Sequence, residues 1–191
     1  QSFTKITPGA ATIMKDFNST LGIKQIQIEV NNEAQNVKIT VTKYDGKPAN
    51  VSVSKTGKVY QYMQIKVDNI ADKLDKASVQ FKVEKTWTTA NNVDKSKITV
   101  SKFDETANKW NELTTTYASE DSTHYYYDVE LTSFSYFAIS EKSVVATDGT
   151  GNGTGTGGTG GEDAGGSLTW LWILIVVVVA AVIWFVMSKK K

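Results

Sequence analysis

The chain has 191 residues, a formal net charge of +1 and no cysteine, and all 21 of its basic residues are lysines. Without cysteine it forms no disulfide and offers no thiolate nucleophile or metal ligand, so core packing and sheet hydrogen bonds must stabilise the fold. A near-neutral chain without arginine also lacks the guanidinium groups and the excess positive charge that phosphate recognition uses. We therefore expect no nucleic-acid partner.

A clear alternation of apolar and polar side chains begins at Lys24, after a weakly patterned segment, 1–22. Because successive side chains of a strand point to opposite faces, this period of two predicts half-buried strands. Turn signals at Asn31-Asn32 and Asp45-Gly46 separate them. The alternating segments of the first half are 24–30, 36–44, 51–53 and 59–67.

In the second half, only residues 68–77 have helical spacing, with Ile70 and Leu74 four residues apart, and we expect at most a short helix there. About nine or ten strands with almost no helix predict an all-β fold. We expect an antiparallel two-sheet β-sandwich of the Ig-like type, spanning residues 1–145. The strands expected in this half are 79–83, 98–100, 109–116, 124–131 and 135–140.

Residues 146–167 are rich in glycine and threonine, and residues 168–187 contain no charge, proline or glycine. The first segment buries too little apolar surface to offset its ordering entropy, so we expect a flexible linker. As a helix the second spans about 30 Å, the thickness of a bilayer's hydrocarbon core, which predicts one transmembrane helix. Its expected membrane-interface anchors are Trp170, Trp172 and Trp184.

Lys189, Lys190 and Lys191 follow this apolar segment, within the tail 188–191. Excess lysine favours the cytoplasmic side of a membrane, so we expect a single-pass cell-membrane protein with an extracellular N-terminal domain and a cytoplasmic tail. Membrane lipid is then a partner. The chain begins at Gln1 without an export signal, so we expect either that a signal was removed or that the sequence is a fragment.

Three N-glycosylation acceptor patterns occur, at Asn18, Asn50 and Asn152, each in an expected loop or in the linker. Exposure outside the cell would make them accessible, so glycans are possible partners. Asn50 and Asn152 are the favoured candidates.

No residue pattern predicts catalysis, a cofactor or a metal. His124 is the single histidine and is expected on the outward face of its strand, and no nucleophile elbow is present. Asp68, Asp72 and Asp75 lack the spacing of calcium loop ligands, and Asp104-Glu105 is typical of a hairpin tip. We therefore expect a non-enzymatic protein.

The aromatic side chains of the second half can be interpreted in two ways. Either they pack the core of a sandwich, or several of them form a coplanar exposed row that binds sugars. Core packing is favoured. These residues are Trp87, Trp110, Tyr117, Tyr125, Tyr126, Tyr127, Phe134, Tyr136 and Phe137.

The block 78–140 resembles the PGF-pre-PGF domain of archaeal cell-surface proteins. Order and spacing are similar throughout, and the matching segments are FKVEKTW at 81–87, NNVD at 91–94, WNELTT at 110–115, YYY at 125–127 and FSYFAI at 134–139. Ser133 stands where the family usually has glycine. Pro8 and Pro48 are the only prolines, so the Pro-Gly-Phe tripeptide that marks anchor removal in related proteins is missing, and we expect the anchor to be retained.

The resemblance implies a β-rich envelope protein without a catalytic residue set. We therefore expect a membrane-anchored structural protein of an archaeal cell surface, which presents its sandwich on a stalk to copies of itself or to other subunits of the envelope or surface layer (S-layer). The alternative is a membrane-tethered carbohydrate-binding or adhesion module.

Overall fold

The computed structural model describes residues 1–70 and 72–143. Within them the chain forms eleven β-strands, one short α-helix and one 3-10 turn. The strands are β1 (Ser2–Ile6), β2 (Thr12–Met14), β3 (Ile23–Val30), β4 (Ala34–Tyr44), β5 (Val59–Asp68), β6 (Leu74–Glu84), β7 (Ile98–Asp104), β8 (Lys109–Glu112), β9 (Thr116–Glu120), β10 (His124–Leu131) and β11 (Tyr136–Glu141); the helical elements are α1 (Lys85–Ala90) and η1 (Lys95–Lys97).

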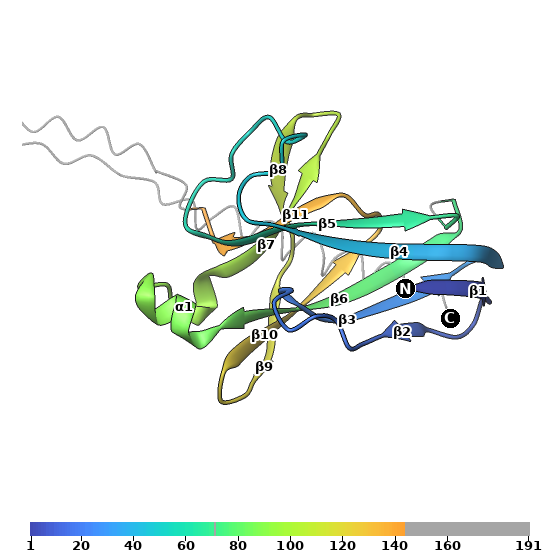
Figure 1. Cartoon of the computed structure of the whole chain (residues 1–191), viewed down its shortest axis with the longest axis horizontal. Coiled ribbons are helices and arrows are strands. Elements are labelled where there is room, and N and C mark those ends of the chain that lie inside the picture. Colours follow the sequence, from blue (N-terminus) through green and yellow to red (C-terminus); the bar gives the residue numbers. More distant parts are fainter. Residues whose placement is uncertain (71, 144–191) are drawn as a thin grey trace, which may run out of the picture. The chain divides into compact units, whose positions relative to one another are not determined.

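The strands form two antiparallel sheets (Figure 1). The six-stranded sheet has the order β1-β4-β5-β11-β7-β8, and the five-stranded sheet has the order β2-β3-β6-β10-β9. The chain passes between the sheets several times, so each sheet contains strands from both halves of the sequence. The predicted all-β class with two antiparallel sheets is confirmed, and the arrangement is consistent with a β-sandwich.

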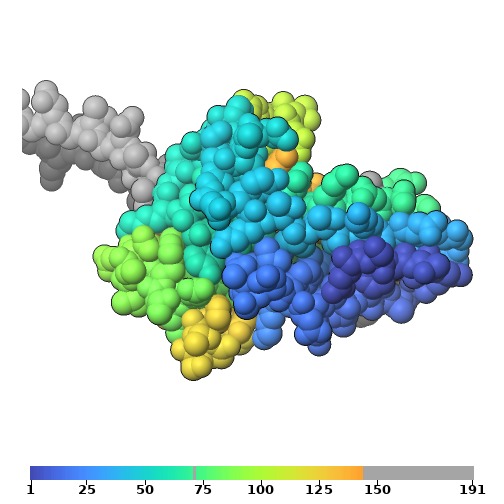
Figure 2. Space-filling view, in the orientation of Figure 1, coloured from blue at the N-terminus to red at the C-terminus, as the bar shows by residue number. Residues whose placement is uncertain are grey.

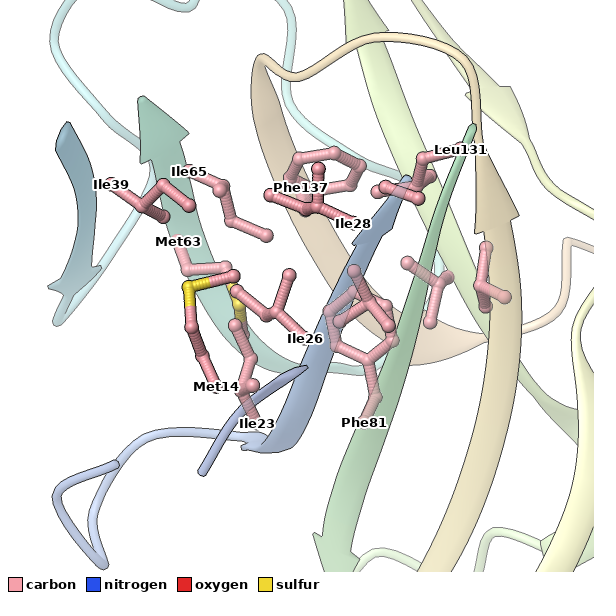
Figure 3. Close-up of a cluster of buried hydrophobic side chains, with 14 of the residues drawn as sticks. Met14, Ile23, Ile26, Ile28, Ile39, Met63, Ile65, Phe81, Leu131 and Phe137 are labelled. Carbon is pink, nitrogen blue, oxygen red and sulfur yellow. The ribbon is translucent and has the colours of Figure 1, made fainter. Parts of the chain in front are cut away.

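One hydrophobic core joins the two sheets (Figure 3). Side chains of β3 and β6 in the five-stranded sheet face those of β5 and β11 in the six-stranded sheet. Phe81 and Phe137 meet across this layer with ring centroids 6.2 Å apart, and both are fully buried. The alternation read from the sequence thus places the expected apolar face of β3, including Ile26 and Ile28, inside.

A second, smaller apolar cluster lies where residues 45–58 cover the six-stranded sheet. Val51 in this segment, called here the covering loop, is buried against Phe103 of β7 and Tyr136 of β11. The alternation at 51–53 therefore does not form a strand: Val51 is inside and Val53 is 40% exposed. Figure 2 shows the covering loop, in cyan to teal, beside the β7–β8 hairpin.

The prediction of a short helix in 68–77 is wrong. β5 ends at Asp68, a tight turn follows, and β6 begins at Leu74. Asn69 takes a left-handed φ of 65°, and the Lys73 N–H donates to the Ile70 carbonyl at 2.9 Å. The four-residue spacing of Ile70 and Leu74 therefore spans a turn between two strands.

The single strand expected over 109–116 is also wrong. The chain forms β8 in the six-stranded sheet and then crosses to form β9 at the edge of the five-stranded sheet. The Leu113 N–H donates to the Val100 carbonyl at 2.9 Å, and the Thr115 hydroxyl accepts from the Val100 N–H at 3.0 Å. These bonds hold the crossing segment at β7.

The expected linker 146–167, membrane helix 168–187 and tail 188–191 lie outside the described residues. Among the helices of 1–70 and 72–143, none has both the length and the apolar character needed to cross a bilayer.

Candidate functional site

The C-terminal end of the described residues follows β11, a strand in the middle of a sheet. β11 lies between β5 and β7 in the six-stranded sheet and is hydrogen-bonded to both. At the end of β11, the Glu141 N–H donates to the Lys58 carbonyl at 2.8 Å, and the Lys142 N–H of the next residue donates to the Lys97 carbonyl at 2.6 Å. Residues 141 and 142 are therefore held from two sides.

Ser143 is fixed by a charged cluster, named here the exit clamp: Lys55, Thr56, Glu112 and Ser143. Lys55 Nζ lies 3.0 Å from Glu112 Oε1 and donates to Ser143 Oγ at 2.7 Å. The Ser143 N–H donates to the same Glu112 oxygen at 2.8 Å, and the Thr56 and Ser143 hydroxyls are 3.1 Å apart. Three distant segments therefore meet at Ser143, the last residue that the structure describes.

Burial makes this ion pair unlike those on the surface. The Lys55 side chain is 3% exposed and the Glu112 side chain 27% exposed. Burial alone would raise the pKa of Glu112, but the bonds from the Ser143 N–H and from Lys55 outweigh it and lower that pKa. The carboxylate is thus held in its charged form by the groups that it binds.

The covering loop brings Lys55 into position. Trp110 of β8 donates its Nε1–H to the Val53 carbonyl at 2.8 Å, and Asn50 donates its side-chain N–H to the Tyr136 hydroxyl at 3.2 Å. Together with the buried Val51, these contacts fix the loop to the half of the sheet formed by β11, β7 and β8. Sequence reasoning did not find the clamp, because its residues are 57 and 88 positions apart and follow no motif.

The two acceptor asparagines within the described residues differ in their surroundings. Asn18 is exposed, and its Oδ1 accepts from both the N–H and the hydroxyl of Thr20 at 3.0 Å. Asn50 is also exposed, but its side-chain nitrogen donates to the Tyr136 hydroxyl, next to the fully buried Val51. The geometry favours Asn18 over Asn50 as a glycan acceptor, the reverse of the sequence-based preference. Asn152 lies outside the described residues.

His124 lies in a small polar network with Thr123, Asp121 and Tyr126. Its Nδ1 is 2.7 Å from the Thr123 hydroxyl and 3.9 Å from Asp121, and its ring stacks on Tyr126 with centroids 6.2 Å apart. Asp121 accepts the N–H groups of Thr123 and His124, as the acidic residue of a tight turn does.

Tyr126 faces away from the core, yet it is only 8% exposed. Lys24 Nζ lies 3.9 Å above its ring, and its hydroxyl donates to Asp121 Oδ2 at 2.5 Å. That bond, together with burial, raises the pKa of Tyr126 to about 12. Strand periodicity predicts that this side chain points away from the core, but it does not predict that Lys24 covers the ring and keeps it from solvent.

The aromatic side chains serve mostly as core. Tyr127, Tyr136 and Phe137 are buried, whereas Tyr117 on β9 is 41% exposed. Tyr117 meets Tyr127 edge-on at an interplanar angle of 74°, and the pair Tyr62–Trp110 is tilted by 46°. These angles favour packing over a coplanar sugar-binding row.

In the described parts of the chain, no three potential ligands among His, Asp and Glu gather closely enough to hold a metal ion. The aspartates 68, 72 and 75 lie around the β5–β6 turn, and Asp104 caps the β7–β8 turn by accepting the N–H groups of Thr106 and Ala107. Comparisons of the chain with models of protein families, with curated proteins and with solved structures return no match.

Proposed function

We propose that this chain is a membrane-anchored structural protein of an archaeal cell surface. The apolar segment 168–187 is its single transmembrane helix, the linker 146–167 is its stalk, and the β-rich domain is extracellular. The domain presents its faces and edges to copies of itself or to other subunits of the envelope or surface layer. The protein is not an enzyme in this proposal.

The exit clamp is the observation that carries the proposal. A domain that is held by its C-terminal end transmits every pull on the stalk through Ser143 into β11. That strand is paired on both sides, so a pull along it loads many hydrogen bonds at once. The Lys55–Glu112 pair, in which the lysine side chain is buried, adds a charged contact at the same point.

The resemblance of residues 78–140 to the PGF-pre-PGF domain supports the cell-surface assignment. Several of the residues that carry this resemblance are structural. Trp87 packs against Tyr60 with centroids 5.2 Å apart, and Trp110 holds the covering loop through Val53. The resemblance therefore concerns the fold and its stabilisation, as a structural role requires.

Electron tomography of native envelopes tests this function. Cells that carry an epitope inserted at Gly46, a turn position with open space around it, are labelled with gold-conjugated antibody. We expect label on the outer face of intact cells and an altered surface layer when the gene is deleted. Label confined to the cytoplasm, or an unchanged envelope in the deletion strain, would contradict the structural role.

A further inference from the structure

Two hollows adjoin at Phe134, where residues 132–135 cross from β10 in one sheet to β11 in the other. Their volumes are about 420 and 260 Å³, within or close to the range of small-molecule sites. Glu105, Phe134 and Ser135 line both of them. We name the two hollows together the Phe134 cleft.

The segment that carries Phe134 is fixed from three sides. The Ser135 carbonyl accepts from the Ile65 N–H at 3.1 Å, and the Ser135 hydroxyl donates to Glu105 Oε1 at 3.0 Å. Lys102 donates to the Ser133 hydroxyl. Phe134 itself packs against the main core while remaining partly exposed. The ring is therefore held in place before any ligand arrives, which reduces the entropic cost of binding.

The walls of the cleft combine apolar surface with polar groups of both hydrogen-bonding types. The polar groups of the larger hollow include Lys102, Glu105 and Asn111, and the smaller hollow adds Gln64 and Lys66. The lysine and amide groups are donors, and the carboxylate and amide oxygens are acceptors. A ligand rich in hydroxyl groups, each of which both donates and accepts, matches this mixture.

The charges of the cleft argue for a neutral ligand. Two lysines, Lys66 and Lys102, stand against two carboxylates, Asp104 and Glu105, so the walls have no excess of either sign. A polyanion or a polycation would meet like charges, which costs binding free energy. Burial lowers the pKa of Lys102, partly offset by the charge of Asp104, so its amine is a partly desolvated donor.

We propose that the Phe134 cleft binds a neutral oligosaccharide. One sugar ring lays its C–H face on Phe134, and its hydroxyls bond to Lys102, Glu105 and Asn111. This site is distinct from the tyrosines of β10, where ring angles do not favour a sugar platform. It adds a ligand to the proposed structural role and does not depend on membrane anchoring.

A glycan array tests the proposal directly. The full chain is solubilised in lauryldimethylamine oxide, because a detergent with a sugar headgroup would compete for the cleft. The array carries neutral oligosaccharides (mannans, β-glucans and chito-oligosaccharides) beside sulfated and uronic-acid glycans. We expect binding to at least one neutral class. Failure to bind any neutral glycan, or binding to charged glycans alone, overturns the proposal.

Variants then place the bound glycan. Asn111→Ala and Glu105→Gln change exposed side chains, so they should keep the fold while each weakens binding about tenfold, the effect of one lost hydrogen bond in a polar site. Phe134→Leu should abolish measurable binding. Tyr117→Leu is the matched control, an exposed aromatic on β9 outside the cleft, and it should leave the affinity unchanged. Unchanged affinity in Asn111→Ala and Glu105→Gln, or loss in Tyr117→Leu, overturns the placement.

Discussion

Lys55 and Glu112 are 57 positions apart in the chain, and their charged atoms lie 3.0 Å apart with the lysine side chain almost fully buried. The lysine belongs to a loop without regular secondary structure and the glutamate ends a short edge strand. What joins them is the exit of the chain at Ser143, which bonds to both. The pair therefore couples the covering loop to the segment that continues toward the proposed stalk.

Replacing Lys55 by methionine keeps the buried length of the side chain and removes its charge. Glu112 then loses its cation but keeps the Ser143 N–H and some solvent contact, so we expect the free energy of unfolding to fall by about 1–2 kcal/mol. Denaturant unfolding of the full chain measures this. Lys5→Met is the control, because the Lys5–Glu33 pair is 52% and 40% exposed and should contribute less than about 0.5 kcal/mol. Equal losses of unfolding free energy in the two variants would show that the Lys55–Glu112 pair stabilises the fold no more than an exposed ion pair does.

Gly22 lies against the core with no room for a side chain. A Cβ there would come within 2.7 Å of Ile139 Cδ1 and 2.9 Å of Gln61 Oε1, the atom that accepts the Gly22 N–H. Gly22→Ala should therefore cost about 1–3 kcal/mol of stability through overpacking. Gly46→Ala, with no atom within 4 Å of the new Cβ, should be neutral or slightly stabilising. Thermal unfolding of both variants measures these changes. A Gly22→Ala variant as stable as the wild type would contradict the packing described here.

Acid should destabilise the β9–β10 edge through Glu120. Lys95 and Tyr117 each bond to this carboxylate at 2.9 Å, and these bonds lower its pKa from 4.5 to about 2. Because the folded pKa lies below the unfolded one, the stabilisation is complete above pH 4.5 and is lost as the pH falls toward about 2.

Melting temperatures recorded from pH 6 to pH 2 measure this loss. The wild type should lose more stability over the acidic part of the range than Glu120→Gln, which has no carboxylate to protonate. High salt should flatten the wild-type curve, since Glu120 is exposed and its interactions are screened. Parallel curves for the wild type and Glu120→Gln would contradict the role assigned to Glu120.

Glycopeptide mass spectrometry of protein from the native host should find a glycan on Asn18 and none on Asn50. Asn18 is exposed in a turn, whereas the Asn50 side-chain nitrogen, the atom that would carry the glycan, is in contact with Tyr136 and stands next to a buried valine. Asn18→Gln should remove the added mass and leave stability unchanged. Asn50→Gln should leave the mass unchanged and lower stability. A glycan on Asn50 in folded protein would show that the covering loop opens.

Strand periodicity predicted much of the fold, because burial between two sheets forces every second side chain to be apolar. β3, β5 and β10 follow this rule, and Met63 and Ile65 of β5 are buried as expected. The rule fails where a strand has no buried face. β9 is exposed along its whole length, so its sequence contains no alternation to read.

The helix α1 could not be predicted from the sequence for a different reason. Its six residues, KTWTTA, include three β-branched threonines, which favour strand over helix, and Glu84 gives it no side-chain cap. Tertiary contacts stabilise it instead: Trp87 packs on Tyr60, and the buried Thr88 donates its hydroxyl to the Lys85 carbonyl at 2.8 Å. The exit clamp and the Phe134 cleft are likewise products of tertiary structure, since each joins segments that are distant in sequence.

The location of residues 168–187 is tested most directly by alkaline carbonate extraction of native membranes, combined with protease treatment of whole cells. The proposed anchor predicts that the full chain stays in the membrane pellet at high pH. It also predicts that protease added outside removes the β-rich domain but leaves an epitope at the C-terminal lysines intact until the cells are opened. Release of the full chain by carbonate, or loss of that epitope on intact cells, would contradict the account.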